Sequence, residues 1–458
     1  MFDSFGQLFF MLMGKVALHT LGCKLNFAET ATIARQFTDR GYEVVAFGNP
    51  ADVVVLNTCT VTEKADRECR QLVRRALRRS PSAYVIVTGC YAQLQPEEIG
   101  AIEGVDLVAG TQEKFRLFEH ATFEKHARAV LRVSSVHASH NVSMADSAGY
   151  DERTRAFVKI QDGCDYQCSF CTIPLARGPS RSVSVQDIVA RAKEIAAGGY
   201  KEIVLTGVNV GDYTADNRDD LLEVIKALES VERIERIRIS SVEPNLLDDE
   251  LLGYWIESTK VCNHFHIPLQ SGSDAVLKRM KRRYNTNWYA GRIESIKAAA
   301  PNAGIGADVI VGFPGETDTL FEETYQFLVE QPLSYLHVFS YSERSNTEAS
   351  VMDGKIDPHV RSERSERLRI LSDRKKRVFQ ERLIGTVVPV LFETPVGNGI
   401  QSGLTGEYVR IHVSGPGSFE NEVRQILITG IREGVCIGEI AEVAGVARVN
   451  ADRKREAV

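Results

Sequence analysis

The sequence predicts an α/β protein in three parts: an N-terminal α/β domain with a parallel sheet, a central partial (β/α)6 barrel and a small C-terminal β-barrel. Short apolar runs alternate with helix-like segments over residues 14–125, which is typical of a parallel sheet with helices on both faces. The alternation becomes regular over 150–377 and favours a curved barrel. Residues 383–446 carry short strand-like runs separated by Gly, which favours a small closed barrel.

The first part places three cysteines at the ends of its candidate strands. We expect strands at 16–18, 42–47, 53–56, 84–87 and 107–110, and helices at 26–39 and 62–79. Cys23 follows the first strand, Cys59 the third and Cys90 the fourth. Ligands gather beyond the carboxyl ends of parallel strands. We therefore expect these thiols to converge on a metal cluster with one iron left open, rather than to be unrelated buried cysteines.

The central part contains six strand–helix units. We expect strands at 156–162, 202–207, 236–241, 264–269, 305–311 and 334–341, and helices at 185–197, 219–229, 274–282, 287–299 and 318–330. In a parallel barrel, functional groups collect at the carboxyl ends of the strands. The sequence therefore predicts that a functional site is formed by the loops after these strands.

The loop after the first of these strands carries Cys164, Cys168 and Cys171. Three thiolates on one tight loop can hold three corners of a cubane iron–sulfur cluster and leave the fourth iron open to a ligand. A zinc site that lacks its fourth ligand and three buried apolar thiols are the alternatives. A Cys3His zinc site is disfavoured because the next histidine downstream is His264.

Polar residues and glycines stand just after the other strands of the central part. Glycine lets the backbone approach a ligand closely, and Ser, Asn, Gln and Glu offer hydrogen bonds to a ribose, an amine or a carboxylate. We expect a cofactor to be bound by Gly207, Asn209, Ser241, Glu243, Gln270 and Gly312.

A long helix links the barrel to the C-terminal part. It is expected to begin at Asp357-Pro358 and to run to about Leu383. Strands are then expected at 386–392, 408–413, 423–429 and 438–444, which favours a small barrel of the oligonucleotide-binding kind. Its aromatic residues Phe392, Tyr408 and Phe419 are either core or platforms for stacked bases.

The composition is that of an ordinary soluble protein, with 43% hydrophobic residues, 25% charged residues and a net charge of −6. Contact with RNA would therefore come from the basic stretches at 67–79, 278–283 and 361–377. A solvated face and favourable pairing with the helix dipole are the alternative explanations for these stretches.

The cysteine usage and the N-terminus bear on the compartment. Nine cysteines, an odd number, favour metal or redox chemistry in a reducing cytosol over a disulfide framework. The apolar run at 8–13 is too short to span a bilayer and lacks the basic region of a signal peptide. We expect a cytoplasmic protein without a membrane partner, in which residues 1–12 are a dispensable extension.

Four segments carry a resemblance to a known family. They are the C-x3-C-x2-C run at 164–171, Thr20-Leu21-Gly22-Cys23-Lys24-Leu25-Asn26, Asn57-Thr58-Cys59-Thr60-Val61-Thr62 and Pro174-Leu175-Ala176-Arg177-Gly178. Across nearly the whole chain, the sequence resembles the methylthiotransferase family of radical S-adenosylmethionine (AdoMet) enzymes, which have a three-cysteine domain, a radical AdoMet barrel and a TRAM domain. The segments look most like those of the enzymes for N6-threonylcarbamoyladenosine at position 37 of tRNA.

The resemblance implies two [4Fe-4S] clusters, held by Cys164, Cys168 and Cys171 and by Cys23, Cys59 and Cys90. The first would bind AdoMet and cleave it to methionine and a 5′-deoxyadenosyl radical. That radical would abstract hydrogen from C2 of adenosine 37 in the anticodon loop, where methylthio is inserted. An electron donor such as flavodoxin or ferredoxin is implied, no side chain is assigned a catalytic role, and we expect a monomer with a TRAM domain that grips RNA.

Three other activities stay open from the sequence. Sister enzymes of the same family act on isopentenyladenosine 37 of tRNA or on an aspartate of a ribosomal protein, and carry different residues around the first cysteine. A non-catalytic iron–sulfur RNA-binding protein would have the same motifs. It would form no deoxyadenosine from AdoMet and dithionite.

Overall fold

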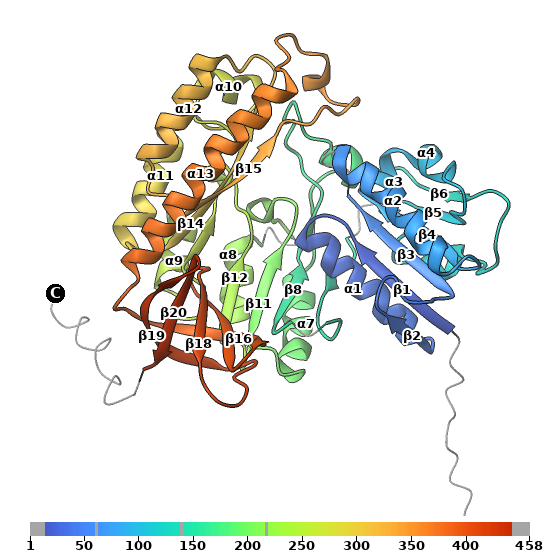
Figure 1. The fold of residues 1–458 in the computed structure, drawn as a ribbon, viewed down its shortest axis with the longest axis horizontal. Coiled ribbons are helices and arrows are strands. Elements are labelled where there is room, and N and C mark those ends of the chain that lie inside the picture. The colour runs from blue at the N-terminus through green and yellow to red at the C-terminus, as the bar shows by residue number, and fades with distance from the viewer. Residues whose placement is uncertain (1–13, 60–62, 138–141, 152, 216–218, 442–458) are drawn as a thin grey trace, which may run out of the picture.

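The computed structural model describes residues 14–59, 63–137, 142–151, 153–215 and 219–441, and its ribbon shows three packed parts (Figure 1). The predicted α/β class and all three architectures are confirmed. The apolar run at 8–13 lies outside the described residues. No helix in the described ranges is both long and apolar enough to cross a membrane.

The N-terminal part is a six-stranded parallel sheet in the order β2-β1-β3-β4-β5-β6. Its strands are β1 (Gly14–Thr20), β2 (Tyr42–Val45), β3 (Val53–Thr58), β4 (Tyr84–Gly89), β5 (Leu107–Ala109) and β6 (Val130–Arg132). Its helices are α1 (Lys24–Thr38), α2 (Glu63–Arg79), α3 (Cys90–Leu94), α4 (Pro96–Gly100) and α5 (Leu117–His120). Strands β3 and β4 are buried along their whole length, as expected for central strands covered on both faces.

The central part has six parallel strands in two neighbouring sheets, β12-β11-β8-β7 and β13-β14-β15. They are β8 (Arg155–Lys159), β11 (Glu202–Thr206), β12 (Arg236–Ile239), β13 (His264–His266), β14 (Gly304–Val311) and β15 (Tyr335–Ser340), with β7 (Ala145–Asp146) antiparallel beside β8. Bridges at Ile237–Val261 and Ser241–His266 join the two sheets. The result is a partial barrel whose two edges are β7 and β15.

The helices of the central part lie between its strands. They are α6 (Ile173–Arg177), α7 (Val185–Ala197), α8 (Leu221–Glu229), α9 (Asp249–Glu257), α10 (Asp274–Arg279), α11 (Thr286–Ala299) and α12 (Asp318–Glu330), and a short strand pair is formed by β9 (Gln161–Asp162) and β10 (Arg181–Ser182). Several helices begin where a short polar side chain accepts a backbone N–H, as Ser184 does for α7 and Thr317 for α12. These caps set the helix starts that sequence patterns predict.

The C-terminal part is a closed five-stranded barrel reached through a long helix. Helix α13 (Pro358–Arg382) leads into β16 (Val387–Gly397), β17 (Ile400–Thr405), β18 (Arg410–Ser414), β19 (Val423–Arg432) and β20 (Val435–Ile440), in the order β16-β17-β18-β20-β19. Phe392 and Phe419 pack in its core with ring centroids 5.3 Å apart, so they are not base platforms. Tyr408 instead lies outside that core, between β17 and β18.

The small barrel is docked against the start of the central strands. Arg236 donates to the carbonyls of Leu404 and Thr405 at 2.8 Å. Arg238 donates to the Gly406 carbonyl at 2.9 Å. The segment that contains Tyr408 is thereby inserted toward the interior of the partial barrel.

Candidate active site

The first cysteine triad lies on the loop after β9. The N–H of Cys164 donates to the Gly178 carbonyl at 3.1 Å, which closes the loop at its base. The turn before it requires Gly163, because its φ is +79° and a Cβ there would lie 2.0 Å from the Pro179 carbonyl oxygen. The loop therefore has one tight backbone conformation that presents its three cysteines together.

Arg282 lies beside the first cysteine triad, and the sequence pattern does not distinguish it from its basic neighbours. Its Nη1 lies 3.1 Å from Sγ of Cys168, and its Nη2 is paired with Glu243. The side chain is 3% exposed, although it belongs to a basic run that was expected to be a helix end or an RNA contact. A buried guanidinium beside Cys168 favours a negatively charged sulfur at that position.

The thiols of this triad suit a metal. Burial raises the pKa of Cys164 to about 11 and that of Cys171 to about 12. Both therefore bind protons at neutral pH, and a metal that binds them displaces those protons. A donor set of sulfur alone on a partly buried loop fits an iron–sulfur cluster.

The second cysteine triad lies at the carboxyl edge of the N-terminal sheet. Cys23 is the N-cap of α1, Cys59 follows β3, and Cys90 begins α3 after β4. A Cβ on Gly22 would lie 2.6 Å from Cβ of Cys59, so the first two loops touch. Because β1, β3 and β4 are neighbours, the topology brings all three loops to one edge, with Cys23 exposed and the other two buried. Three thiols at one partly open position fit a cluster with one free iron.

Arg177 joins the two triads. It lies at the end of α6, and its Nη2 donates to Oδ1 of Asn26 at 2.6 Å. Its Nη1 donates to Glu29 at 3.0 Å and to Asp162 at 2.8 Å. Asn26 and Glu29 belong to the helix that begins after Cys23, whereas Asp162 precedes the Cys164 loop. One buried guanidinium thus contacts segments next to both cysteine sites.

Three of the residues expected to bind the cofactor lie close to one another after β11 and β12. Asn209 is 4% exposed, and neither its Oδ1 nor its Nδ2 has a hydrogen-bond partner among the described residues. Such a buried amide fits a hydrogen bond to a ligand. Gly207 instead leaves room for Gln161, whose Oε1 would lie 2.8 Å from a Cβ there. Ser241 pairs with Nδ1 of His266 at 2.6 Å.

The other three have different surroundings. Glu243 is held by Arg282 beside Cys168, which keeps it at the cluster loop. Gln270 has a φ of +70°, an uncommon conformation that ends the run after β13. A Cβ on Gly312 would lie 2.3 Å from Cγ of Arg361, so this glycine lets the loop after β14 pack closely against α13.

A group of histidines and one aspartate occupies the interior of the partial barrel. Oδ1 of Asp308 lies 3.1 Å from Nε2 of His266 and 3.2 Å from Nδ1 of His337. Burial acts to raise the pKa of Asp308, but hydrogen bonds to the two imidazoles outweigh it and hold that pKa below its usual value. The sequence signal for this group is the presence of polar residues inside otherwise apolar strands.

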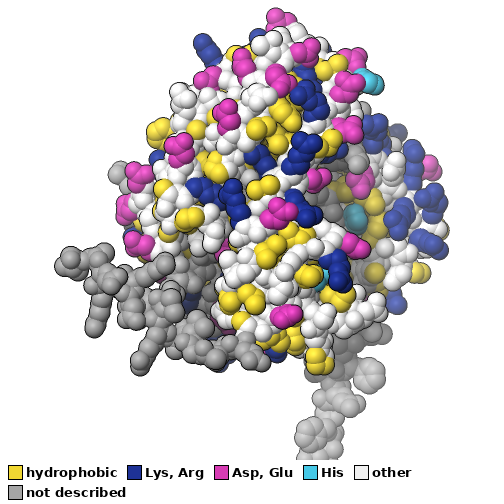
Figure 2. Space-filling view, turned by 60° about the vertical axis from the view of Figure 1, so that its left-hand side comes forward, with side chains coloured by type: hydrophobic (Ala, Val, Ile, Leu, Met, Phe, Trp, Pro, Cys, Tyr) yellow, Lys and Arg dark blue, Asp and Glu magenta, His cyan; other side chains and the backbone are white. Residues whose placement is uncertain are grey.

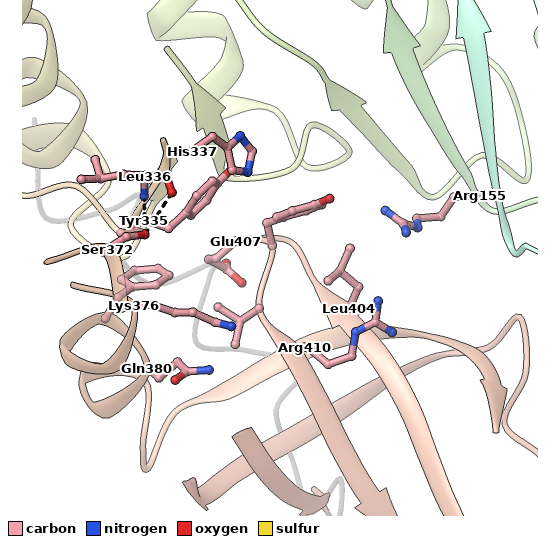
Figure 3. Close-up of a pocket in the computed structure, with 14 residues that line it drawn as sticks. Arg155, Tyr335, Leu336, His337, Ser372, Lys376, Gln380, Leu404, Glu407 and Arg410 are labelled. Atoms are coloured by element: carbon pink, nitrogen blue, oxygen red, sulfur yellow. Dashed lines mark hydrogen bonds between the residues drawn. The ribbon is translucent and has the colours of Figure 1, made fainter. Parts of the chain in front are cut away.

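A cavity of about 340 Å³ opens between β15, α13 and the small barrel. Figure 3 shows Tyr335, His337 and Lys376 on one side of it, and Arg155 and Arg410 on the other. Its lining includes His337, which also belongs to the interior group. The cavity therefore leads from the junction with the small barrel into the partial barrel.

Lys24 reaches this region from the N-terminal part. Its Nζ lies 5.7 Å from the centre of the Tyr408 ring, and His264 stacks on the same ring at 4.6 Å. No carboxylate forms an ion pair with Lys24 among the described residues. Because Lys24 directly follows Cys23, an unpaired ammonium group stands between the second cysteine triad and the barrel interior.

Comparisons with known proteins agree with this arrangement. The model of the Radical SAM superfamily matches residues 158–328, and that of uncharacterized protein family UPF0004 matches residues 15–110. A solved structure of the radical S-adenosylmethionine methyltransferase TsrM from Kitasatospora setae is similar with a TM-score of 0.53 at 14% identity, over 74% of this chain and 75% of that chain. This second likeness concerns the fold alone.

Similarity to curated sequences extends over most of the chain. The threonylcarbamoyladenosine tRNA methylthiotransferase MtaB of Bacillus subtilis is 41% identical over 88% of this chain and 91% of the relative. The protein of the same name from Aquifex aeolicus is 41% identical over 80% and 90%. The tRNA-2-methylthio-N(6)-dimethylallyladenosine synthase of Akkermansia muciniphila is 32% identical over 84% and 89%. The chain therefore belongs to the methylthiotransferase family of radical S-adenosylmethionine enzymes.

Proposed function

We propose that this enzyme transfers a methylthio group to C2 of N6-threonylcarbamoyladenosine at position 37 of tRNA. The observation that carries the proposal is the polar group of His266, Asp308 and His337 in the partial barrel, together with Lys24, which follows Cys23 and lies over the Tyr408 ring. Two relatives that are each 41% identical to this chain bear the name of this activity. Membership of the family supports the reaction type, and the polar residues of the interior support the choice of substrate.

The six cysteines would divide the chemistry between two cofactors. In the proposal, Cys164, Cys168 and Cys171 hold the [4Fe-4S] cluster to which AdoMet binds, and Cys23, Cys59 and Cys90 hold a second cluster. The cofactors supply the radical and the sulfur needed at an unreactive C–H bond. The protein holds the two sites on either side of one interior, where Asn209 has free hydrogen-bonding groups for AdoMet.

The modified base has a feature that the interior can recognise. A threonylcarbamoyl group carries a carboxylate, whereas an isopentenyl group is wholly apolar. A buried or recessed carboxylate needs a charged partner, and Lys24 is such a partner beside Cys23. An isopentenyl group would leave that ammonium without a counter-charge. The surroundings of Lys24 therefore favour threonylcarbamoyladenosine.

Exposed arginines of α2 are the best candidates for contact with the RNA backbone. Arg74, Arg78 and Arg79 are exposed on this helix, and Figure 2 shows Lys and Arg side chains gathered at the right-hand edge of its view. In the other two basic stretches, many side chains are already paired, such as Lys281 with Glu348 and Arg364 with Glu316. We propose that α2 and the small barrel grip the anticodon loop.

The remaining expectations belong to the same proposal. We propose the domain limits 14–125, 150–377 and 383–446, with the last as a TRAM domain. We propose a cytoplasmic monomer that receives electrons from a flavodoxin or ferredoxin. The described residues contain no membrane-spanning helix that would conflict with this.

Nucleoside analysis of tRNA by mass spectrometry tests the function. Bulk tRNA from a strain that lacks the gene is expected to contain N6-threonylcarbamoyladenosine without its 2-methylthio derivative, and the gene is expected to restore that derivative. A strain that loses the 2-methylthio derivative of isopentenyladenosine instead would show the sister activity. Unchanged tRNA with an unmodified ribosomal-protein aspartate would assign the protein substrate.

A further inference from the structure

A buried cluster of charged side chains lies at the interface between the N-terminal part and the partial barrel. Each side chain in it is at most 5% exposed as a residue, and three of them are cations. Its members are Glu29, Lys114, Lys159, Asp162 and Arg177. We call these five residues the charge network.

The charge network is connected by short contacts. Nζ of Lys114 lies 2.7 Å from Oε2 of Glu29, and Nζ of Lys159 lies 3.1 Å from both Glu29 and Asp162. Arg177 contacts both carboxylates as well, at 3.0 Å and 2.8 Å. Every cation shares a carboxylate with another cation, so no cation has a counter-charge of its own.

The charge network is also bonded to the backbone that carries the cysteines. Asn26, which accepts from Arg177, donates through Nδ2 to the Leu21 carbonyl at 2.8 Å and to the Thr58 carbonyl at 3.1 Å. These carbonyls lie just before Cys23 and Cys59. Oδ1 of Asp162 accepts from the N–H of Gly163 at 3.0 Å, directly before the other triad. A displacement of Arg177 would therefore move the backbone next to both cysteine triads.

The network has one positive charge too many. Three cations and two carboxylates leave a net charge of +1 in a region closed to water. An uncompensated buried charge is costly, so the fold is expected to supply an anion nearby. Helix α6, which ends at Arg177, contacts α3, which begins at Cys90. The charges of Arg177 and Lys114 act on the Cys90 sulfur. Cys90 is thus the sulfur that faces the excess charge.

We infer that the charge network positions the second cluster and balances its charge, with Arg177 as the residue that links the two cysteine sites. This inference rests on the proposed function, because it requires a cluster on Cys23, Cys59 and Cys90. The excess positive charge is then the counterpart of thiolate charge at Cys90. It stabilises the reduced, more negative form of that cluster. Arg177 is a positioning residue, since it acts through Asn26 and Asp162.

The test uses the full-length chain with Cys164, Cys168 and Cys171 replaced by alanine, so that the second cluster is observed alone. After anaerobic reconstitution this background is expected to bind roughly four irons per chain. The reduction potential is followed by electron paramagnetic resonance during a redox titration. We expect Arg177→Gln to shift the potential to a more negative value, because one positive charge is removed. Arg177→Lys, which retains the charge, is expected to restore most of the shift.

Arg35→Gln is the matched control. Arg35 lies on α1, the helix that carries Asn26 and Glu29, and its Nη2 also crosses the interface to Asp146 at 2.7 Å, but it contacts neither cysteine loop. In the Arg35→Gln variant, the reduction potential of the second cluster is expected to equal that of the background protein. An equal shift in Arg35→Gln and Arg177→Gln, or no shift in Arg177→Gln at full iron content, would overturn the inference. If Arg177→Gln does not fold, Lys114→Met takes its place with the same expected direction.

The inference and the proposed function fail in distinguishable ways. A background variant that binds no iron removes the second cluster and the proposed division of cysteines with it. A background variant that binds iron, with a potential insensitive to Arg177 and Lys114, overturns the charge network alone. The identity of the modified nucleoside is measured separately and depends on neither result.

Discussion

At the scale of single residues, the proposed choice of substrate depends on Lys24. It follows Cys23 in the chain and faces the Tyr408 ring, which the small barrel contributes. The side chain thus lies where the second cysteine triad, the barrel interior and the small barrel meet. A charge-assisted contact there would align the N6 substituent, and with it the C2 atom, relative to the sulfur source.

Replacement of Lys24 by Met is expected to raise the KM for an anticodon stem-loop that carries threonylcarbamoyladenosine by roughly 10- to 100-fold, the value of one lost charge-assisted hydrogen bond. The methyl ester of the threonylcarbamoyl group lacks the negative charge. Its KM is therefore expected to be the same for Lys24→Met and for the unchanged enzyme. Lys193→Met, an exposed change on α7, is the control. Equal discrimination against the ester by Lys24→Met and the unchanged enzyme would contradict the role of Lys24.

A second residue-scale prediction concerns the turn before the first cysteine triad. Gly163→Ala places a Cβ 2.0 Å from a backbone oxygen at positive φ, so the loop must move. Iron bound per chain is expected to fall by about half, from roughly eight to roughly four, with loss of AdoMet cleavage. Gly149→Ala is matched, since its φ is +72° but no atom lies within 4 Å. The idea fails if both variants keep full iron content.

At the scale of elements, the docking of the small barrel on the central strands depends on a buried ion cluster. Glu202 on β11 lies 2.9 Å from Arg236 and 2.8 Å from Arg238 of β12, and both arginines bind carbonyls of the small barrel. Burial acts to raise the pKa of Glu202, but the two guanidinium groups lower it to about 2 from 4.5. The carboxylate therefore holds the arginines in the orientation that docking needs.

This cluster predicts a pH dependence of stability. The folded pKa lies below the unfolded one, so the stabilisation, roughly 3 kcal/mol, is present above about pH 4.5 and is lost as the pH falls toward 2. Glu202→Gln is expected to have a lower Tm than the unchanged protein at pH 7, with a difference that shrinks below pH 4.5. Glu223→Gln, at an exposed ion pair, is the control. A difference in Tm that is independent of pH would refute the role of Glu202.

At the scale of the whole molecule, three parts surround one interior. The N-terminal sheet brings one cysteine triad, the partial barrel brings the other, and the small barrel closes the start of the central strands (Figure 1). Hydrogen bonds through Arg177 and Asn26 fix the first two parts relative to each other. The arrangement suits a reaction in which two cofactors act on one base.

The sequence is sufficient to predict the fold class and the convergence of the cysteines, because strand ends in parallel sheets lie at one edge. Contacts that depend on how the three parts pack against one another cannot be predicted from local sequence patterns. Arg177 and Glu29 are 148 positions apart, and no local pattern links them. Arg282 sits in a basic run whose neighbours are exposed, so its burial beside Cys168 follows only from tertiary packing. The packing of Gly312 against Arg361 of α13 likewise follows from tertiary structure.

One assay distinguishes the roles of the two cysteine triads. Purified variants are incubated with AdoMet, dithionite and tRNA that contains threonylcarbamoyladenosine, and both deoxyadenosine and the 2-methylthio nucleoside are quantified. Cys164→Ala is expected to abolish both products. Cys90→Ala is expected to form deoxyadenosine without the 2-methylthio nucleoside. Loss of deoxyadenosine to the same extent in both variants would contradict the account.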